Sequence, residues 1–299
     1  MRGCRYLPWS GVVECQPGGS ASVTPPLPAR GGAATTSAVR TTASFAYNSG
    51  IWTEQLARII VQAQPCVVLT GAGVSTESGI PDFRSPTGIW ATYDPMEYAT
   101  IDAFRRDPAK VWGFYAKRLG VLAQAKPNAA HVALAELERR GLVEVVITQN
   151  VDGLHQAAGS KRVIEVHGSI RSASCLGCGH REEYERVIEF GPVPACAECG
   201  AVLKPDVVMF GELLPAGAME EASELVRRAG LLLVVGSSLE VYPVAGLPED
   251  AIRAGARLAI VNRGPTPYDS RADLKIDASA GETLAAALAA LDASPPDQL

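Results

Sequence analysis

Long apolar runs are missing from this sequence. No stretch approaches the roughly 20 residues that a membrane-spanning helix needs, and no apolar secretory segment opens the chain. Basic charge is also scarce, because the formal net charge is −5 and the isoelectric point is about 5.5. Such a balance disfavours a nucleic-acid-binding surface. We therefore expect neither a membrane nor a nucleic acid among the partners, and we expect the protein to act as a monomer.

The first 50 residues lack hydrophobic periodicity and hold a single acid, Glu14. Thirty of them are Gly, Ala, Ser, Thr or Pro and four are Arg, so this segment carries +3 and the rest of the chain −8. Little apolar surface is then available to offset the entropy of ordering the chain, which predicts a disordered extension over residues 1–50. Two alternatives stay open: an organelle transit peptide, which is typically acid-poor and contains Ser and Arg, and a start codon assigned too early.

Beyond residue 50 the sequence alternates apolar runs with helical periodicity. Strands buried on both faces are predicted at 66–70, 144–148, 231–236 and 257–261. Helices are predicted from a cap at Thr53 up to Pro65, and over 130–141, 217–230 and 281–291. Repeated strand–helix units predict an α/β fold with a Rossmann-like, doubly wound parallel sheet, whose ligands bind at the carboxyl ends of the strands.

Two segments break this alternation and predict a small inserted domain. Residues 86–128 have helical patterns without strands, and residues 171–200 are dense in Cys, Gly and charge. We expect a helical module over the first segment and a zinc-binding module over the second. The Rossmann-like core would then comprise residues 51–85, 129–170 and 201–292, within a catalytic domain over 51–299.

Four of the seven cysteines form two Cys-x-x-Cys pairs separated by 17 residues: Cys175, Cys178, Cys196 and Cys199. This spacing is typical of a zinc ribbon. Four thiolates would fill all the positions of tetrahedral zinc, so no position is left for an activated water and the ion is expected to be structural. Thiols kept free for a metal indicate a reducing compartment, and we expect a cytoplasmic protein.

The stretch "TGAGVSTESGIPDFRS" (70–85) begins as a nucleotide-binding loop and then departs from that pattern. Gly71 and Gly73 follow a strand, but Thr76 stands where a dinucleotide fingerprint has its third glycine. The acid expected about 20 residues later is also missing. A hydride-transferring dehydrogenase is therefore disfavoured. The small residues still let the backbone come close to a phosphate.

Polar residues follow several of the predicted strands. They are Gln149, Asn150 and Asp152 in "TQNVDGLH", His167 in "EVHGSI", the Gly-Ser-Ser turn at 236–238, and Asn262. Each has an ordinary structural interpretation, such as a capped turn or a packed histidine. Since the carboxyl ends of parallel strands share one edge of a sheet, the set together predicts one cleft.

These motifs, in this order, resemble the sirtuin family of NAD-dependent protein lysine deacylases. The resemblance rests on "GAGVSTESGIPDFR", "TQNVDGLH", "EVHG", the two cysteine pairs, "LKPDVVMFGE", "GSSLEVYP" and "VN", and "AKPNAAHVALAELERRGLVEVVITQN" is most similar to the bacterial branch. It covers roughly residues 52–292. It implies an acyl-transferring enzyme that uses NAD and holds one zinc ion. Acyl-lysine proteins would be its substrates, and the products would be lysine, nicotinamide and 2′-O-acyl-ADP-ribose.

The resemblance also implies site residues. The catalytic group is His167 as general base, with Asn150, Asp152 and Arg84. The other NAD-binding positions are Gly71, Ala72, Gly73, Glu77, Asp82, Phe83, Trp90, Gln149, Val151, Gly236, Ser237, Ser238, Asn262, Arg263, Gly264 and Ala280. The substrate-binding positions are Ala99, Tyr115, Arg118, Val208, Phe210, Gly211 and Glu212. A strand over 207–212 is expected to pair with the extended substrate backbone.

Tyr115 and Arg118 fall at i and i+3 of a predicted helix. They resemble the Tyr/Arg pair with which some sirtuins bind acidic acyl groups, and Ala99 would leave room for such a group. Asp82 departs from that subgroup, whose members often lack it. We expect a deacylase for both acetyl- and succinyl-lysine. A protein mono-ADP-ribosyltransferase and a non-catalytic NAD-responsive binding module are the alternatives.

Overall fold

The computed structural model describes residues 5–6, 13–14, 43–187 and 191–293. The chain divides into two compact units, residues 1–41 and 42–299. The first contains the antiparallel pair β1 (Arg5–Tyr6) and β2 (Val13–Glu14). The rest of the predicted disordered extension up to residue 42 lies outside the described residues.

Helix α1 (Ala43–Gln62) begins within the segment that was predicted to be disordered. Thr53 is therefore inside a helix and does not cap its start, and its hydroxyl donates to the Gly50 carbonyl one turn earlier at 3.0 Å. The sequence prediction failed here because the first turns of α1 are rich in Ala, Ser, Asn and Gly and carry a weak apolar pattern. The second unit accordingly starts before residue 50.

The second unit is built on a six-stranded sheet in which every neighbouring pair is parallel. Its spatial order is β11 (Leu274–Ile276), β10 (Arg257–Val261), β9 (Leu231–Val235), β3 (Cys66–Thr70), β4 (Val145–Thr148) and β5 (Val163–Glu165). All residues of β3 and β9 are buried, as expected for apolar strands covered on both faces. The predicted Rossmann-like sheet is confirmed.

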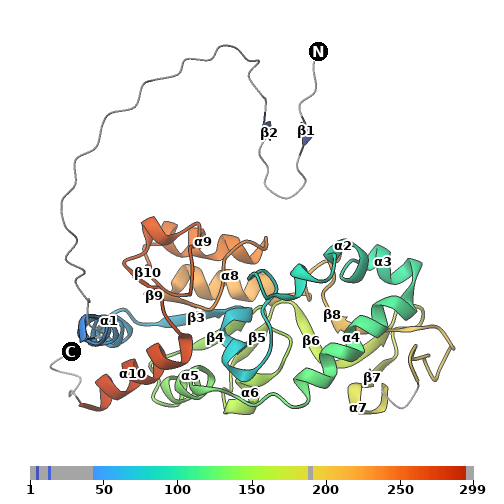
Figure 1. Ribbon diagram of the computed structural model, residues 1–299, viewed down its shortest axis with the longest axis horizontal. Helices are drawn as coiled ribbons and strands as arrows, with labels where there is room; N and C mark the ends of the chain where they lie inside the picture. Colours follow the sequence, from blue (N-terminus) through green and yellow to red (C-terminus); the bar gives the residue numbers. More distant parts are fainter. Residues whose placement is uncertain (1–4, 7–12, 15–42, 188–190, 294–299) are drawn as a thin grey trace, which may run out of the picture. The chain divides into compact units, whose positions relative to one another are not determined.

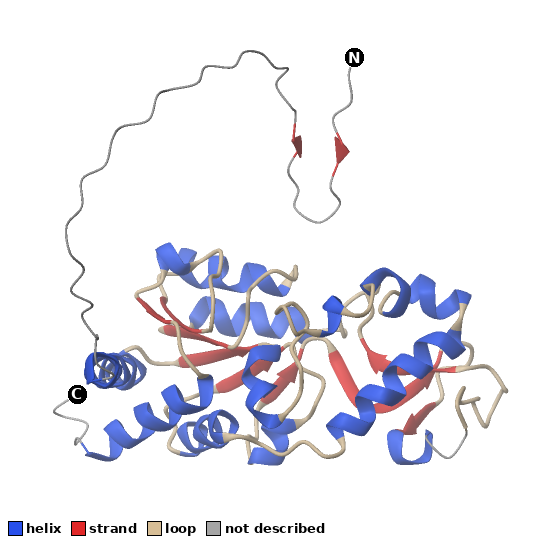
Figure 2. Cartoon of the chain, in the orientation of Figure 1, coloured by secondary structure: helices blue, strands red, loops and turns tan. Residues whose placement is uncertain are grey.

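Helices cover both faces of this sheet (Figures 1 and 2). On one face lie α1, α5 (Ala129–Arg139) and α10 (Ala280–Ala293), which pack Leu56, Leu134 and Leu284 into one core cluster. On the other lie α8 (Ala218–Arg228) and α9 (Leu247–Arg253), which pack Leu225 and Leu247 into a second cluster. A short helix, α6 (Leu154–Ala158), follows β4. Among the described residues, no helix has the length and apolarity to cross a membrane.

A second, three-stranded antiparallel sheet carries the cysteine pairs. It has the order β7 (Arg181–Glu183), β6 (Gly168–Cys175), β8 (Leu203–Val207), and α7 (Tyr184–Val187) follows β7. This sheet extends beyond the predicted zinc module at both ends, because β6 begins at Gly168 and pairs with β8, which ends at Val207, across one register shift. The predicted strand over 207–212 is wrong in extent: β8 ends at Val207.

The segment 86–128 is helical, as predicted. It contains the 3₁₀ turn η2 (Ile89–Ala91) and the helices α2 (Pro95–Tyr98), α3 (Ile101–Arg106) and α4 (Pro108–Leu122). Asp107 caps α4 by accepting from the Lys110 N–H at 3.0 Å, and Pro108 occupies the first turn. These helices and the three-stranded sheet share one hydrophobic core, and the Trp112 indole donates to the Leu203 carbonyl of β8 at 2.8 Å.

Candidate active site

The sheet reverses its direction of strand addition between β3 and β9, so the loops that follow these two strands meet at a switch point. Gly71 and Gly73 follow β3, and Gly236 follows β9. A Cβ on Gly73 would lie 2.8 Å from the Gly236 carbonyl oxygen, which accepts the Gly73 N–H at 2.8 Å. Gly236 itself has φ +61. Only glycine fits at these positions, because the two backbones touch.

The loop after β3 differs from a dinucleotide fingerprint for a visible reason. Residues Ala72–Ser78 form a 3₁₀ turn, η1, that ends at Gly79 in the left-handed conformation. The chain then enters the segment Asp82-Phe83-Arg84 and does not continue as a long helix. Backbone bonds hold this segment, since Ile89 and Trp90 donate to the carbonyls of Asp82 and Phe83 at 2.9 Å.

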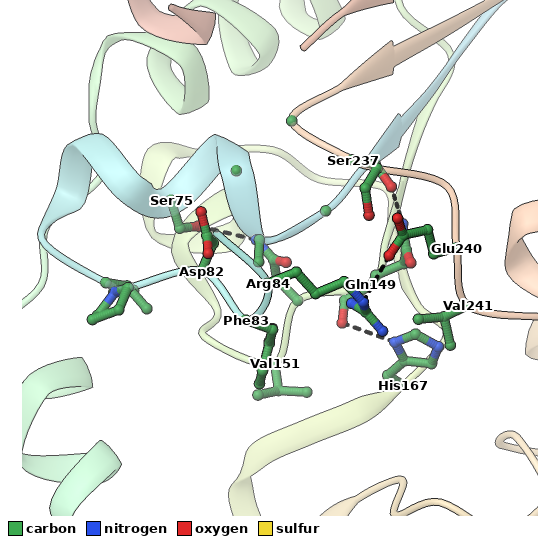
Figure 3. Close-up of a pocket in the computed structure, with 18 of the residues that line it drawn as sticks. Ser75, Asp82, Phe83, Arg84, Gln149, Val151, His167, Ser237, Glu240 and Val241 are labelled. Atoms are coloured by element: carbon green, nitrogen blue, oxygen red, sulfur yellow. Dashed lines mark hydrogen bonds and ion pairs between the residues drawn. The ribbon is translucent and has the colours of Figure 1, made fainter. Parts of the chain in front are cut away.

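A cavity of about 1030 Å³ opens at this edge of the sheet. Every position predicted to bind NAD or substrate lines it, on loops from both sheets and from the helical segment. Gln149, after β4, connects to the loop after β9, because its side-chain amide donates to Ser237 Oγ at 2.9 Å (Figure 3). The structure thus brings the predicted residues together, while their individual roles stay predictions.

His167 lies between β5 and β6 and borders the cavity. Its Nδ1 is 3.1 Å from the Gln149 carbonyl oxygen (Figure 3), which can only accept, so Nδ1 carries the proton and Nε2 keeps its lone pair. Burial lowers the pKa of His167, the bond to Gln149 opposes this, and the positive charge of Arg84 lowers the pKa further. The ring is therefore a neutral base at neutral pH.

Asn150 and Asp152 are joined by a residue that the sequence interpretation missed. Ser75 Oγ accepts from Asn150 Nδ2 at 3.0 Å and donates to Asp152 Oδ2 at 2.8 Å. The other Asp152 oxygen accepts from the Leu154 N–H at 2.9 Å. A serine in a small-residue loop carries no distinctive signal by itself, so only its spatial position identifies it.

Arg84 forms an ion pair across the cavity mouth with Glu240, from the loop after β9 (Figure 3). Arg84 Nε and Glu240 Oε2 are 2.9 Å apart, and the two side chains are 39% and 54% exposed. Glu240 was not among the predicted site residues. Phe83 packs against Trp90 with ring centroids 5.2 Å apart, so the loop places an apolar ring beside its cation.

Tyr115 and Arg118 both face the cavity from α4. Tyr115 is buried, and burial raises the pKa of its hydroxyl to about 12. The Arg118 guanidinium carbon lies 4.8 Å from the centre of the Phe83 ring, and no carboxylate of the described residues forms an ion pair with Arg118. Burial lowers the pKa of Arg118, while Tyr115 and Asp152 raise it. Ala99 lines the same cavity.

The segment 208–212 is held from both sides by backbone bonds. Val208 donates to the His167 carbonyl at 2.9 Å, and Phe210 donates to the Ala99 carbonyl at 2.8 Å. Glu212 Oε2 accepts from the Met209 N–H at 2.8 Å and lies 3.0 Å from Lys204 Nζ. Sequence reasoning missed Lys204, a buried lysine that fixes this turn.

Glu77, a predicted NAD-binding position, has its carboxylate engaged within the protein. Its Oε1 accepts from Ser279 Oγ at 2.7 Å and from the Gly281 N–H at 3.1 Å, at the start of α10. A carboxylate at a helix N-terminus is favoured by the helix dipole. Glu77 therefore ties the loop after β3 to the segment that presents Ala280.

The four sulfur atoms of Cys175, Cys178, Cys196 and Cys199 lie within 4.8 Å of one another. The Cys175–Cys199 and Cys178–Cys196 sulfur pairs are 3.4 and 3.6 Å apart, and all four are free of disulfides. Four converging thiols with no fifth ligand of the described residues in the cluster fit one structural zinc ion, as predicted.

The sequence of this chain is similar to those of known proteins. The Sir2 family model matches residues 71–243. An NAD-dependent protein deacylase 2 of Pyrobaculum aerophilum is 49% identical over 77% of this chain and 92% of its own length, and an NAD-dependent protein deacylase of Thermus thermophilus is 46% identical over 82% and 96%. An NAD-dependent protein deacetylase of Thermotoga maritima is 48% identical over 73% and 89%.

Solved structures also resemble this chain in fold and sequence. A Sir2 variant with a deacetylated p53 peptide and 3′-O-acetyl-ADP-ribose superposes with a TM-score of 0.76 at 44% identity, covering 79% of this chain and 97% of its own. A Sir2 protein bound to a propionylated peptide gives 0.72 at 43% identity, covering 78% and 95%. Fold, switch-point cavity, cysteine cluster and relatives lead to one conclusion: this chain belongs to the Sir2 family, the sirtuins.

Proposed function

We propose that this chain is an NAD-dependent protein lysine deacylase that removes acetyl groups and, through Arg118, acidic acyl groups such as succinyl. The observation that carries the proposal is one cavity that joins a glycine-lined switch point to a neutral histidine and an unpaired cation. Its relatives are named protein deacylases and deacetylases. The products would be lysine, nicotinamide and 2′-O-acyl-ADP-ribose.

The residues at the switch point suit an extended dinucleotide. Gly71 and Gly73 let the backbone approach phosphates, and Ser237 and Asn262 offer hydroxyl and amide groups at the ends of β9 and β10. Asn150 and Asp152 would border the nicotinamide ring. NAD, when bound, supplies a ribose carbon that becomes electrophilic as its bond to nicotinamide breaks.

The protein contributes orientation, exclusion of water and one proton acceptor. Phe83 and Trp90 cover the cavity with apolar rings, which would keep water from the reacting carbon. With Nδ1 of His167 committed to Gln149, its Nε2 lone pair can take a proton from a ribose hydroxyl. A substrate backbone would lie along 208–210, which backbone hydrogen bonds hold to His167 on one side and to Ala99 on the other.

Arg118 supports the acyl proposal. A guanidinium that is desolvated and forms no ion pair with a carboxylate of the described residues favours an incoming anion, and an arginine can grip a carboxylate with two hydrogen bonds. Tyr115 would add its hydroxyl. An acetyl group needs neither contact, so both acyl types can enter.

The direct test incubates one peptide, bearing acetyl-, succinyl- or unmodified lysine, with the protein in the presence and absence of NAD. Mass spectrometry should show NAD-dependent acyl loss from both modified peptides. Acyl loss from neither peptide by folded, zinc-loaded protein would reject the proposal. In that event, label from adenine-labelled NAD on protein would indicate mono-ADP-ribosyl transfer, and its absence would indicate a binding role.

We also propose a monomer that works in the cytoplasm on protein substrates and not on nucleic acid. The acidic net charge and the four zinc thiols support this. Light scattering after size exclusion should give the mass of one 31.4 kDa chain, and a dimer mass would contradict the first part.

A further inference from the structure

A chain of buried hydrogen bonds lies behind Asn150 and takes no part in the mechanism above. It runs from His155 on α6 through Thr70 at the end of β3 to Thr148 at the end of β4. His155 Nε2 is 2.9 Å from Thr70 Oγ1, the two threonine hydroxyls are 2.8 Å apart, and Thr148 Oγ1 accepts the Asn150 N–H at 3.1 Å. Thr70, His155 and Thr148 are 0%, 1% and 3% exposed.

The direction of these bonds fixes the state of the histidine. Thr70 donates its one hydroxyl proton to Thr148, so it can only accept from His155, whose Nε2 must carry a hydrogen. His155 Nδ1 is then an unprotonated nitrogen, and it is buried with no hydrogen-bond partner. If instead Thr70 donated to His155 Nε2, then Nδ1 would carry the hydrogen and bury an N–H without a partner, which is the rarer and less favourable case.

A second set of hydrogen bonds reaches the Asn150 side chain, and in it too a histidine carries its proton on Nε2. The Asn128 N–H donates to His131 Nδ1 at 3.3 Å, so His131 Nε2 is the protonated nitrogen and points to Ser75 Oγ at 3.4 Å. Ser75 also receives Asn150 Nδ2, which leaves Asn150 Oδ1 as the acceptor available to a ligand. The two imidazoles lie together, with ring centroids 4.8 Å apart.

Thr70 and Thr148 are aligned partners in the β3–β4 register. Their hydroxyls therefore meet because the two strands end together, and the Asn150 backbone is attached to that junction. The contact with Thr148 fixes the main chain of Asn150, and the contact with Ser75 fixes which side of its amide faces the cavity. Loss of the Thr148 contact would release the main chain of Asn150, and loss of the Ser75 contact would let the amide NH₂ replace the oxygen at the cavity wall.

We propose that His155, Thr70 and Thr148 are positioning residues that hold Asn150 in the orientation needed to recognise the nicotinamide amide of NAD. The inference rests on the proposed function of the same site. It differs from a purely structural role, because it predicts an effect on nicotinamide and NAD that exceeds any effect on the acyl peptide.

The first experiment measures the wild-type protein and uses variants only to assign its signals. Nitrogen-15 NMR of the intact protein, with signals assigned by His155→Gln and His131→Gln, should show both rings as neutral Nε2–H tautomers throughout neutral pH. A neutral Nδ1–H tautomer of His155, or a protonated ring, would overturn the proposed direction of the chain.

The second experiment uses isosteric variants. Thr70→Val removes the hydroxyl and keeps the shape, and Thr70→Ser keeps the hydroxyl. We expect Thr70→Val to raise the Kd of nicotinamide and the KM of NAD by roughly tenfold, and Thr70→Ser to retain most of the affinity. The KM of the acyl peptide should change less than twofold. Thr148→Val should raise the Kd of nicotinamide and the KM of NAD by a similar amount.

A matched control removes a hydroxyl elsewhere. Thr266→Val deletes a donor to Asp269 and should leave nicotinamide binding unchanged. Folded Thr70→Val with wild-type nicotinamide binding, or Thr70→Ser as weak as Thr70→Val, would overturn the inference. Calorimetric binding of nicotinamide and NAD is independent of turnover, so failure of the deacylase proposal would instead appear as an inactive wild-type protein.

Discussion

Arg118 carries a positive charge into the cavity, and no carboxylate of the described residues lies within ion-pair distance of it, although Asp152 is near enough to raise its pKa. Its guanidinium carbon lies over the rings of Phe83 and Phe114, 4.8 and 5.9 Å from their centres. Cation–π contacts of this kind are weaker than a bidentate carboxylate pair. The acyl group is therefore expected to complete this site when it is acidic.

Arg118→Met tests this role. Removing the guanidinium should lower kcat/KM for succinyl-lysine by roughly 10- to 100-fold, the range for a lost charged hydrogen bond, while deacetylation changes only a few-fold. Paired kinetics on acetyl and succinyl forms of one peptide give the answer. Unchanged rates on both would show that Arg118 does not select the acyl group. Lys117→Met, on the same helix but exposed, is a matched control.

His155 should make stability depend on pH. Burial, followed by the neighbouring His131, lowers the pKa of His155 to about 3 from an ordinary value of 6.5. Between pH 6.5 and 3 the unfolded chain binds a proton at His155 that the folded chain does not. The stabilisation from the neutral ring is therefore present above pH 6.5 and is lost as the pH falls from 6.5 towards 3.

The loss is on the order of a few kcal/mol over that window. Denaturant unfolding of wild type and His155→Gln at several pH values measures it, since carboxylates contribute equally to both proteins. The variant should be less stable at neutral pH and show a shallower decline below pH 6.5. Parallel curves would show that folding does not lower the pKa of His155.

At the scale of elements, the three-stranded sheet depends on its four thiols. The sheet is small, and the turns that carry Cys178 and Cys199 are exposed, so few apolar contacts hold them. Structural zinc sites supply folding free energy directly. The helices of residues 86–128 share a core with this sheet, so damage to it should reach the side of the cavity that Tyr115 and Arg118 line.

Cys196→Ser should abolish binding of one zinc ion per chain, lower the melting temperature and reduce deacylation more than tenfold. Atomic absorption and thermal melting are the measurements. Cys66→Ala is the control: its thiol is buried in β3, so it should keep the zinc and lose only packing. Full zinc occupancy in Cys196→Ser would contradict the proposed ligand set.

The elements differ in how well the sequence predicted them. Buried parallel strands such as 66–70 and 257–261 were predicted to the residue, because a continuous apolar run has clear ends. The start of α1 was missed because its first turns lack an apolar stripe, and the end of β8 because 208–212 keeps an apolar sequence after its ladder stops. Ser75, Lys204 and Glu240 were missed because their importance lies in contacts between distant segments.

The whole molecule brings two differently built sheets to one cavity. The parallel sheet contributes the switch point with its glycines, and the antiparallel sheet and helices contribute Tyr115, Arg118 and the segment 208–212. His167 lies where β5 of one sheet passes into β6 of the other. Under the proposed function, His167 at that junction would face the dinucleotide on one side and the acyl-lysine on the other.

The most direct test of this account measures nicotinamide release and acyl-ADP-ribose together, for wild type and His167→Ala, with NAD and an acetylated peptide. Wild type should form both products in equal amounts, and His167→Ala should form acyl-ADP-ribose roughly 10²- to 10⁴-fold more slowly. Nicotinamide release without acyl transfer in wild type, or an unchanged rate in His167→Ala, would contradict it.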